Sequence, residues 1–230
     1  MAAAAPVIAV LLSPALAGSE RRAWDFGRFL STAATFNSPV DAVGRALSRV
    51  DRPPLRPGDL VWAPERPSGC VFAPLDDVVM GGCSESSLTL TPQSLLWTGT
   101  LTTANNGGFT GIRTKTFTTP LDASRCQGIA LRVRADGFRY KCILRDSSDW
   151  NGVAWTASFN TRRGAEQVVK LPFSSFVPTK FAQTVTTDPL RLSSLLAIQL
   201  SLSKFEYDGD LNPTFKEGPF SLELKEITTF

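Results

Sequence analysis

The sequence predicts an all-β fold, an antiparallel sandwich or jelly roll. Apolar and polar residues alternate with the period of two that a half-buried strand requires, most clearly over residues 196–203. Clusters of Gly, Asn, Asp and Ser separate such segments at short intervals, as is typical of strands joined by turns. Because no helical repeat lies between the strands, a parallel α/β sheet is not expected.

The β domain is expected to cover residues 70–230, after an extension over residues 1–69. Strands are predicted where alternation or a short apolar run occurs, at 88–90, 96–101, 129–133, 140–144, 155–159, 168–171, 196–202 and 220–224. Turns are predicted between them, at 105–108, 135–137, 147–149 and 207–209. Short strands separated in this way favour a sandwich over a single open sheet.

The extension divides into three parts. Residues 2–17 are apolar, and Ala15-Leu16-Ala17 before Gly18 resembles a targeting cleavage site, but no basic residue precedes it. It is either an incomplete targeting segment or a small anchor helix. Apolar residues at helical spacing predict a short amphipathic helix over 39–50. Residues 52–67 are rich in proline and are expected to be a linker without regular structure.

Composition excludes several classes of function. The net charge of +3 is too small to indicate nucleic-acid binding. The chain has no histidine, which excludes a Ser–His–Asp triad and every metal site that needs imidazole. Four cysteines are present without a Cys-x-x-Cys pair, so a zinc site is not expected and buried free thiols are favoured.

The most informative stretch runs from Asp76 to Ser86. Two acids are followed by a short apolar run, Gly81-Gly82 and small polar residues. The glycines predict a tight turn or bulge, and Gly82→Val is expected to cost stability through backbone strain. Adjacent strand residues point to opposite faces, so Asp76 and Asp77 are not expected to form a catalytic pair.

A second stretch begins at Gly107-Gly108 and continues to Lys115. A glycine-rich loop can bind phosphate, but this one has neither P-loop spacing nor a Gly-x-Gly-x-x-Gly motif. The simpler interpretation is a turn that enters a strand on which Arg113 and Lys115 share one face. If that face is functional, two aligned cations would suit an acidic partner or a phosphate.

Two later stretches suggest other chemistry. Residues 136–140 predict a hairpin turn at Gly137. Trp150 and Trp155 lie near acids and would suit sugar binding if they were exposed, although large aromatics are more often in the core. Residues 203–220 form a long polar and aromatic loop of the kind that often carries function, without the spacing of a calcium-binding EF-hand.

Three motifs together resemble the complex I intermediate-associated protein 30 family. They are Asp-Asp-Val-Val-Met-Gly-Gly-Cys-Ser at 76–84, Gly-Gly-Phe-Thr-Gly-Ile-Arg-Thr-Lys at 107–115 and Leu-Arg-Val-Arg-Ala-Asp-Gly-Phe-Arg-Tyr at 131–140. The resemblance spans about residues 71–227, and segments 24–29 and 203–220 are similar to its plastid and cyanobacterial branch. Ala135 departs from the usual glycine, and a tryptophan expected shortly before Leu171 is missing.

The resemblance implies a galactose-binding-like jelly-roll β-sandwich with a short, partly helical N-terminal extension. It also implies an assembly factor or chaperone rather than an enzyme, with no cofactor and no metal. Its partners would be protein subunits of a membrane complex under assembly, either NADH dehydrogenase complex I or a thylakoid complex. Peripheral membrane association is compatible with this role. The chloroplast is favoured as the location, and the mitochondrion is the alternative.

Seven side chains are expected to be exposed and to contact the partner, namely Asp76, Asp77, Arg113, Lys115, Asp136, Arg139 and Tyr140. Five glycines are expected to shape turns, namely Gly81, Gly82, Gly107, Gly108 and Gly137. The alternative function is a carbohydrate-binding β-sandwich module, because this architecture hosts many functions. An enzyme would need a base built from carboxylates, and no convergent pair is visible in the sequence.

Overall fold

The computed structural model describes residues 35–36, 52–66, 70–149 and 151–230. The apolar segment 2–17, the helix expected over 39–50 and Trp150 lie outside the described residues. Thr35 and Phe36 are helical, and four short 3-10 helices occur in the rest of the described chain, η1 (Asp77–Met80), η2 (Ala104–Asn106), η3 (Phe173–Ser175) and η4 (Leu192–Ser194). None of the described helices is long and apolar enough to cross a membrane.

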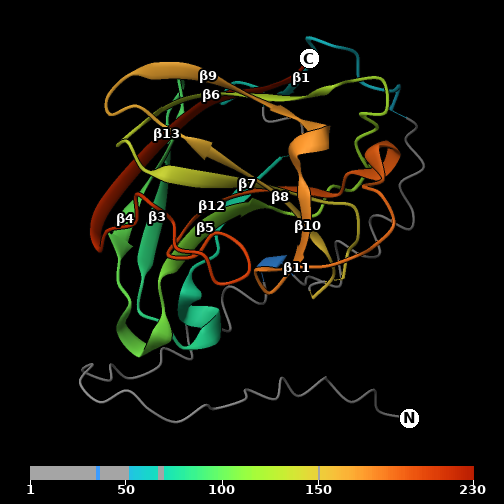
Figure 1. The fold of residues 1–230 in the computed structure, drawn as a ribbon. Helices are drawn as coiled ribbons and strands as arrows, with labels where there is room; N and C mark the ends of the chain where they lie inside the picture. Colours follow the sequence, from blue (N-terminus) through green and yellow to red (C-terminus); the bar gives the residue numbers. More distant parts are fainter. Residues whose placement is uncertain (1–34, 37–51, 67–69, 150) are drawn as a thin grey trace, which may run out of the picture.

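Two antiparallel sheets form the body of the protein (Figure 1). The six-stranded sheet has the order β3-β4-β13-β6-β9, and β1 pairs with β13 where β4 has ended. Its strands are β1 (Leu60–Trp62), β3 (Glu85–Leu90), β4 (Leu95–Leu101), β6 (Gly128–Ala135), β9 (Glu166–Pro172) and β13 (Gly218–Thr229).

The seven-stranded sheet has the order β11-β10-β8-β7-β12-β5-β2. Its strands are β2 (Phe72–Pro74), β5 (Phe109–Thr114), β7 (Arg139–Arg145), β8 (Ala154–Asn160), β10 (Val177–Lys180), β11 (Gln183–Thr184) and β12 (Ala197–Ser203). The predicted jelly-roll β-sandwich is therefore confirmed.

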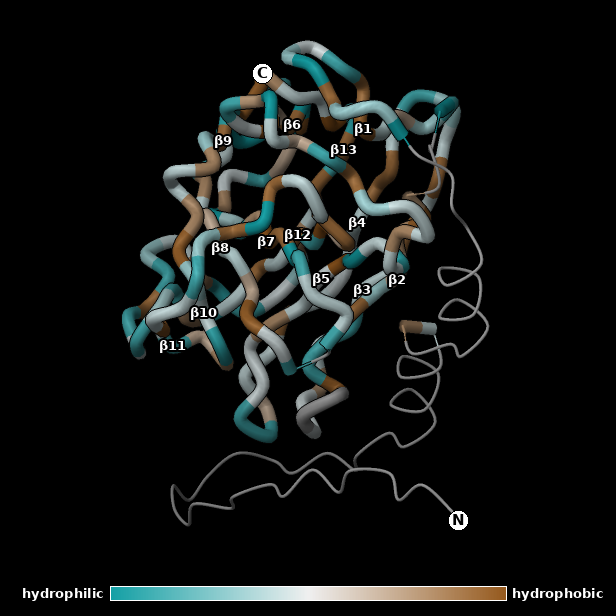
Figure 2. Tube along the Cα trace, turned by 90° about the vertical axis from the view of Figure 1, so that its right-hand side faces the viewer, coloured by the Kyte–Doolittle hydropathy of each residue, from teal (hydrophilic) through white to brown (hydrophobic). Residues whose placement is uncertain are grey.

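The core lies between the sheets, because every second residue of each strand points inward. Trp97 on β4 is fully buried, and its ring contacts Tyr140 of the facing sheet and Phe220 of its own sheet, with centroids 5.9 and 5.0 Å away. Tyr140 stacks in turn on Phe159. In Figure 2 apolar segments recur along the strands, whereas the turns around the sandwich are mostly hydrophilic. Burial of these aromatic side chains is the main source of stability.

Two expectations are wrong. Residues 52–67 were expected to be an unstructured linker, yet Leu60–Trp62 forms β1, and Val61 and Trp62 are buried in the core. Residues 136–140 were expected to close a hairpin, yet β6 and β7 belong to different sheets. The chain at Gly137, which has a φ of +99°, therefore crosses from one sheet to the other.

The outward face of the seven-stranded sheet is also covered. On β12, Ile198, Leu200 and Leu202 point into the core. The alternate residues Gln199 and Ser201 point away from it and are nevertheless buried, at 8% and 5% exposure. Something other than the second sheet must therefore shield this polar face, and the loops that do so form the candidate site.

Candidate functional site

A groove of about 420 Å³ lies on the outward face of the seven-stranded sheet. Strand register fixes the positions on its floor. Gln199 of β12 is paired with Arg113 of β5 on one side and with Ile143 of β7 on the other. Arg145 lies two residues beyond Ile143 and therefore projects from the same face of β7. Central strands thus hold two arginines and an amide at fixed spacing.

The floor of the groove carries more cations than acids. Three of its ionisable lining residues are basic, Arg113, Lys141 and Arg145, and two are acidic, Asp77 and Glu206. Burial lowers the pKa of Arg113, and the nearby charge of Arg145 lowers it further. Burial also lowers the pKa of Arg145. The nearby charge of Asp149 partly offsets the effect of burial on Arg145, so the two guanidinium groups lie in a partly dry site whose charge is not theirs alone.

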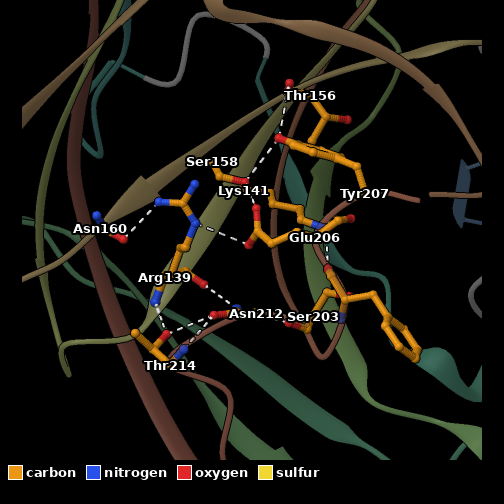
Figure 3. A network of polar contacts seen from close by, with 11 residues as sticks. Arg139, Lys141, Thr156, Ser158, Asn160, Ser203, Glu206, Tyr207, Asn212 and Thr214 are labelled. Atoms are coloured by element: carbon orange, nitrogen blue, oxygen red, sulfur yellow. Dashed lines mark hydrogen bonds and ion pairs between the residues drawn. The ribbon is translucent and has the colours of Figure 1, made fainter. Parts of the chain in front are cut away.

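A long loop over residues 204–217 walls one side of the groove and is fixed by buried Asn212 (Figure 3). The Asn212 amide donates to the carbonyl oxygens of Arg139 and Ser203, at 2.9 and 3.0 Å. Its side-chain oxygen accepts from the backbone and hydroxyl of Thr214, and the Thr214 hydroxyl accepts from the Arg139 backbone at 2.7 Å. These bonds fasten the loop to β7 and make the wall rigid.

Two further residues hold the same loop in place, Lys141 of β7 and Glu206 of the loop itself (Figure 3). The Lys141 ammonium donates to the carbonyl oxygens of Phe205 and Glu206 and lies 5.1 Å from the centroid of the Tyr207 ring. Burial lowers the pKa of Lys141 to about 8. The Glu206 carboxylate accepts from Ser158 at 2.5 Å and lies 3.3 Å from the guanidinium of Arg139. These contacts position the Phe205–Tyr207 segment at the groove.

Exposed aromatic rings stand at the rim of this groove. Among the described residues, the aromatic side chains that are exposed are Phe181 and Phe205, at 75% and 40%, and both line the groove. Phe181 has a φ of +52°, in the left-handed region that bulky residues rarely adopt. Strained backbone and exposed aromatic surface at one place are typical of a binding site.

The Asp76-Asp77 pair holds loops together and is not exposed. Asp76 accepts from the backbone and hydroxyl of Ser86, at 2.9 and 2.6 Å, and from Thr110 at 2.5 Å. Asp77 accepts from the backbone and hydroxyl of Ser84, at 2.9 and 2.7 Å, and from the Gly108 backbone at 2.8 Å. The two carboxylates thus serve different partners, as expected, but not because of strand alternation, since Asp76 precedes and Asp77 begins the 3-10 helix η1.

Both glycine pairs pack around Asp77. Gly81 and Gly108 have positive φ, at 88° and 126°, as turn glycines should. A Cβ atom at Gly82 or Gly107 would lie closer than 3.0 Å to the Asp77 carboxylate. The cause expected for the cost of Gly82→Val was therefore wrong. Close packing against Asp77, rather than a left-handed backbone, excludes a side chain at Gly82.

Asp136 and Tyr140 also have structural roles. The Tyr140 hydroxyl donates to the Asp136 carboxylate at 3.0 Å, and this carboxylate accepts from the backbone of Phe138 and Ser221. Burial raises the pKa of Tyr140 well above its usual value, and Asp136 adds to the effect. These contacts hold the segment that crosses between the two sheets against β13.

The expected exposure of the seven partner-contact residues is wrong for four of them. Burial leaves 4% or less of each exposed, namely Asp76, Asp77, Arg113 and Tyr140. Asp136 and Arg139 are half-buried, and Lys115 is exposed. Lys115 follows the end of β5 and does not line the groove with Arg113, so the two do not share a functional face. Partner contact by any of the seven stays a prediction.

The sequence pattern missed most of the groove. Gln199 and Phe181 carried no motif, and Tyr207 was part of the loop at 203–220 that the sequence singled out, but their proximity arises only when the strands and loops are folded. Cys70, Cys126 and Cys142 are buried thiols, as expected, and Cys83 is half-buried. Within the described residues, no group of three Cys, Asp or Glu side chains could hold a metal ion.

Together these features define an all-β sandwich domain with a polar, aromatic-rimmed groove on one sheet. The sequence model of the family described as Complex I intermediate-associated protein 30 matches residues 66–224, which is more than half of the chain. The chain therefore belongs to the complex I intermediate-associated protein 30 family. No curated protein sequence matches it significantly.

Solved structures resemble this chain in fold. They include the agarase AgWH50C, with a TM-score of 0.49 and 12% identity over 76% of this chain and 25% of that chain. They also include the family 11 carbohydrate-binding module of cellulase Lic26A-Cel5E from Clostridium thermocellum, with a TM-score of 0.47 and 16% identity over 80% of this chain and 96% of that module. Such low scores and identities carry no functional argument.

Proposed function

We propose that this protein is a non-catalytic assembly factor that binds assembly intermediates of an organellar membrane complex. Family membership supports a role related to complex I assembly in general. The observation that carries the proposal is the groove, in which rigid loops present Phe181 and Phe205 to solvent beside a cationic floor. Exposed aromatic residues and arginine are the side chains that most often dominate protein–protein contacts.

The chemistry of the groove supports binding without catalysis. A general base needs a carboxylate or another basic group that can reach a substrate proton. Asp77 is 1% exposed and already accepts from Ser84 and Gly108. Glu206 is engaged by Ser158 and Arg139. Both acids that line the groove are thus committed to holding its walls.

The proposed client is a subunit of NADH dehydrogenase complex I or of a thylakoid complex. The chloroplast is favoured because segments 24–29 and 203–220 resemble the plastid and cyanobacterial branch, and the mitochondrion is the alternative. Association with the membrane would be peripheral and would follow from binding the client. No nucleic acid is proposed as a partner, since the small excess of positive charge is scattered along the chain.

A pull-down of the tagged full chain from gently solubilised organelle membranes tests this proposal, with the co-purifying proteins identified by mass spectrometry. The expected result is enrichment of subunits of one membrane complex over a tag-only control. Complex I subunits would place the client in that complex, and thylakoid subunits would place it in the plastid. Recovery of no membrane-complex subunit would contradict the proposal.

Carbohydrate binding is the second candidate. Its supporting observation is again the pair of exposed rings at the groove, since sugars stack on aromatic faces. The tryptophan expected to favour it does not, because Trp155 is 8% exposed and packs in the core, and Trp150 lies outside the described residues. Retention of the chain on a glycan array, with no subunit recovered in the pull-down, would favour this candidate.

A further inference from the structure

We infer that the groove binds an extended, uncharged segment of the client polypeptide, in which Gln199 pairs with the backbone of the segment and Phe181 contacts its apolar side chains. This inference rests on the proposed function, because it takes the ligand to be protein. It adds the chemical class of the segment and the two residues that recognise it.

Gln199 indicates that the groove takes a hydrogen-bond donor. It lies on the central strand β12, lines the groove and is 8% exposed. Within the described residues, its side-chain oxygen is buried and accepts no hydrogen bond. A buried amide oxygen without a donor costs free energy, and such groups are rare in native proteins. A ligand that brings a donor into the groove removes this cost.

Neighbouring hydroxyl groups of the floor are bonded within the protein. The Ser201 hydroxyl donates to the carbonyl oxygen of Thr110 at 3.1 Å. The Thr179 hydroxyl donates to the carbonyl oxygen of Ala154 at 3.0 Å and lies 3.0 Å from the Thr156 hydroxyl. The unpaired amide oxygen differs from these groups, and the stability of the fold does not account for it.

The arginines of the floor do not require an acidic ligand. Phe36 covers Arg113, with the guanidinium carbon 5.6 Å from the ring centroid. The Arg145 guanidinium donates to the carbonyl oxygen of Asp149 at 3.4 Å, and the charge of Asp149 raises the pKa of Arg145 against the effect of burial. Both cations are therefore engaged before a ligand arrives, and a neutral segment fits this floor.

A peptide group is the complement of a glutamine side chain. Each residue of a polypeptide other than proline carries an N–H donor and a C=O acceptor, and both need partners when they are buried. A glutamine amide offers the same pair, an oxygen that accepts and an NH2 group that donates. Gln199 can therefore pair with the backbone of an extended segment, whose N–H and C=O groups are not already bonded within a helix.

The turn between β10 and β11 presents the apolar contact. Lys180 pairs with Gln183, so Phe181 and Ala182 form a two-residue hairpin loop, and both have positive φ, at 52° and 59°. Such a loop, as in a type I′ turn, favours Asn-Gly, so phenylalanine opposes the local preference. The Phe181 ring is 75% exposed and lines the groove. A strained position that presents an exposed ring to a groove indicates binding rather than folding.

The test uses the full chain and two fluorescein-labelled pentapeptides. One alternates phenylalanine with serine, and the other has the same sequence with every backbone N–H methylated. Fluorescence anisotropy is expected to show roughly tenfold tighter binding of the unmodified peptide, because only this peptide can donate to Gln199. Gln199→Met is expected to weaken the unmodified peptide by a similar factor and to bind both peptides about equally. It should not lower the free energy of unfolding, since it removes an unpaired buried oxygen.

Gln93→Met is the matched control, because Gln93 is an exposed glutamine between β3 and β4 of the opposite sheet. It should leave both affinities unchanged. Equal binding of the two peptides to the wild-type chain, or binding of neither, would overturn the inference without requiring any variant to fold. A Gln199→Met protein that still prefers the unmodified peptide would also overturn the role of Gln199.

Phe181→Asn separates binding from folding at the turn. Asparagine suits the left-handed backbone, so the free energy of unfolding should be unchanged or higher. Loss of the exposed ring should nevertheless weaken the unmodified peptide several-fold. A variant that is less stable than the wild type, or that binds the peptide as tightly, would show that the ring does not serve the ligand.

A neutral oligosaccharide is the competing ligand, since its hydroxyl groups also donate. Binding of cellohexaose that depends on Gln199, with no binding of the peptides, would overturn the polypeptide assignment. Failure here is distinct from failure of the proposed function. If the pull-down recovers complex subunits equally with the wild type and Gln199→Met, the assembly role stands and the backbone-binding site does not.

Discussion

At the scale of single residues, Asp77 explains why the motif at 76–84 and the motif at 107–115 belong together. Its carboxylate accepts from Ser84 of the first motif and from Gly108 of the second. Gly82 and Gly107 leave room for it on both sides. The two motifs are thus one structural unit that fixes the loop at 106–109 against the groove.

Gly82→Ala is expected to lower the free energy of unfolding by about 3 kcal/mol, because the new Cβ would displace the Asp77 carboxylate from its donors. Urea denaturation measures this. Gly209→Ala is the control, since Gly209 has a φ of +91° but open space around it. It should cost only about 1 kcal/mol, from backbone strain alone. A Gly82→Ala protein as stable as the wild type would refute the packing around Asp77.

Lys141 predicts a dependence of stability on pH. Its pKa is lowered from 10.5 to about 8 by burial, so below pH 8 both states carry the proton and burying the charge opposes folding. Between pH 8 and 10.5 the unfolded chain binds more protons than the folded chain. The contribution of this group to stability therefore rises with pH in that window.

Denaturation of the wild type and Lys141→Met tests this at pH 7 and pH 10. The difference in free energy of unfolding, wild type minus variant, is expected to be larger at pH 10. Groups that do not contact Lys141 are common to both proteins, so their contributions cancel in the difference. A difference that is flat or that shrinks with pH would show that Lys141 stays charged in the folded state.

At the scale of elements, the long loop over residues 204–217 behaves as a fixed wall. Asn212→Ala is expected to speed hydrogen exchange in this loop by roughly tenfold or more, because four hydrogen bonds to β7, Ser203 and Thr214 are lost. Exchange in β6 and β13 should not change. Asp210→Ala, on the exposed part of the loop, is the control. Slow exchange that persists in Asn212→Ala would mean that other contacts hold the loop.

The long strands could be predicted from the sequence, and the short ones could not. Alternation at 129–133 and 220–224 identified β6 and part of β13, because one face of each strand lies in the core. β1, β2 and β11 have two or three residues each and offer no measurable period. The prolines around β1 also made the sequence indicate a linker. Only the pairing of β1 with β13, which the sequence does not show, makes this segment a strand.

Of the candidate site, the sequence indicated the motif at 76–84 and the loop at 203–220, but not how they come together. The bonds between Asp76 and Ser86 and between Asp77 and Ser84 join residues close in sequence, so a short motif carries them. The groove joins β12 with loops near residues 106, 181 and 206, and its residues are close only in space. Alternation shows that Gln199 and Ser201 share a face, but it cannot show that loops cover that face.

At the scale of the whole molecule, the two outward faces of the sandwich differ. The six-stranded sheet presents exposed ion pairs, in which Glu166 lies near Arg132 and Lys225. Such surface pairs contribute little to stability. The seven-stranded sheet presents the groove, its aromatic rim and its buried cations. We therefore expect the client to bind the outward face of the seven-stranded sheet.

A photo-crosslinking amino acid placed at Phe181, and separately at Val168, tests this assignment most directly. Phe181 is at the rim of the groove, and Val168 is an exposed position, at 52%, on β9 of the other sheet. Irradiation with gently solubilised organelle membranes is expected to join membrane-complex subunits to the chain from Phe181 and not from Val168. Crosslinking of those subunits from Val168 and not from Phe181 would contradict the account.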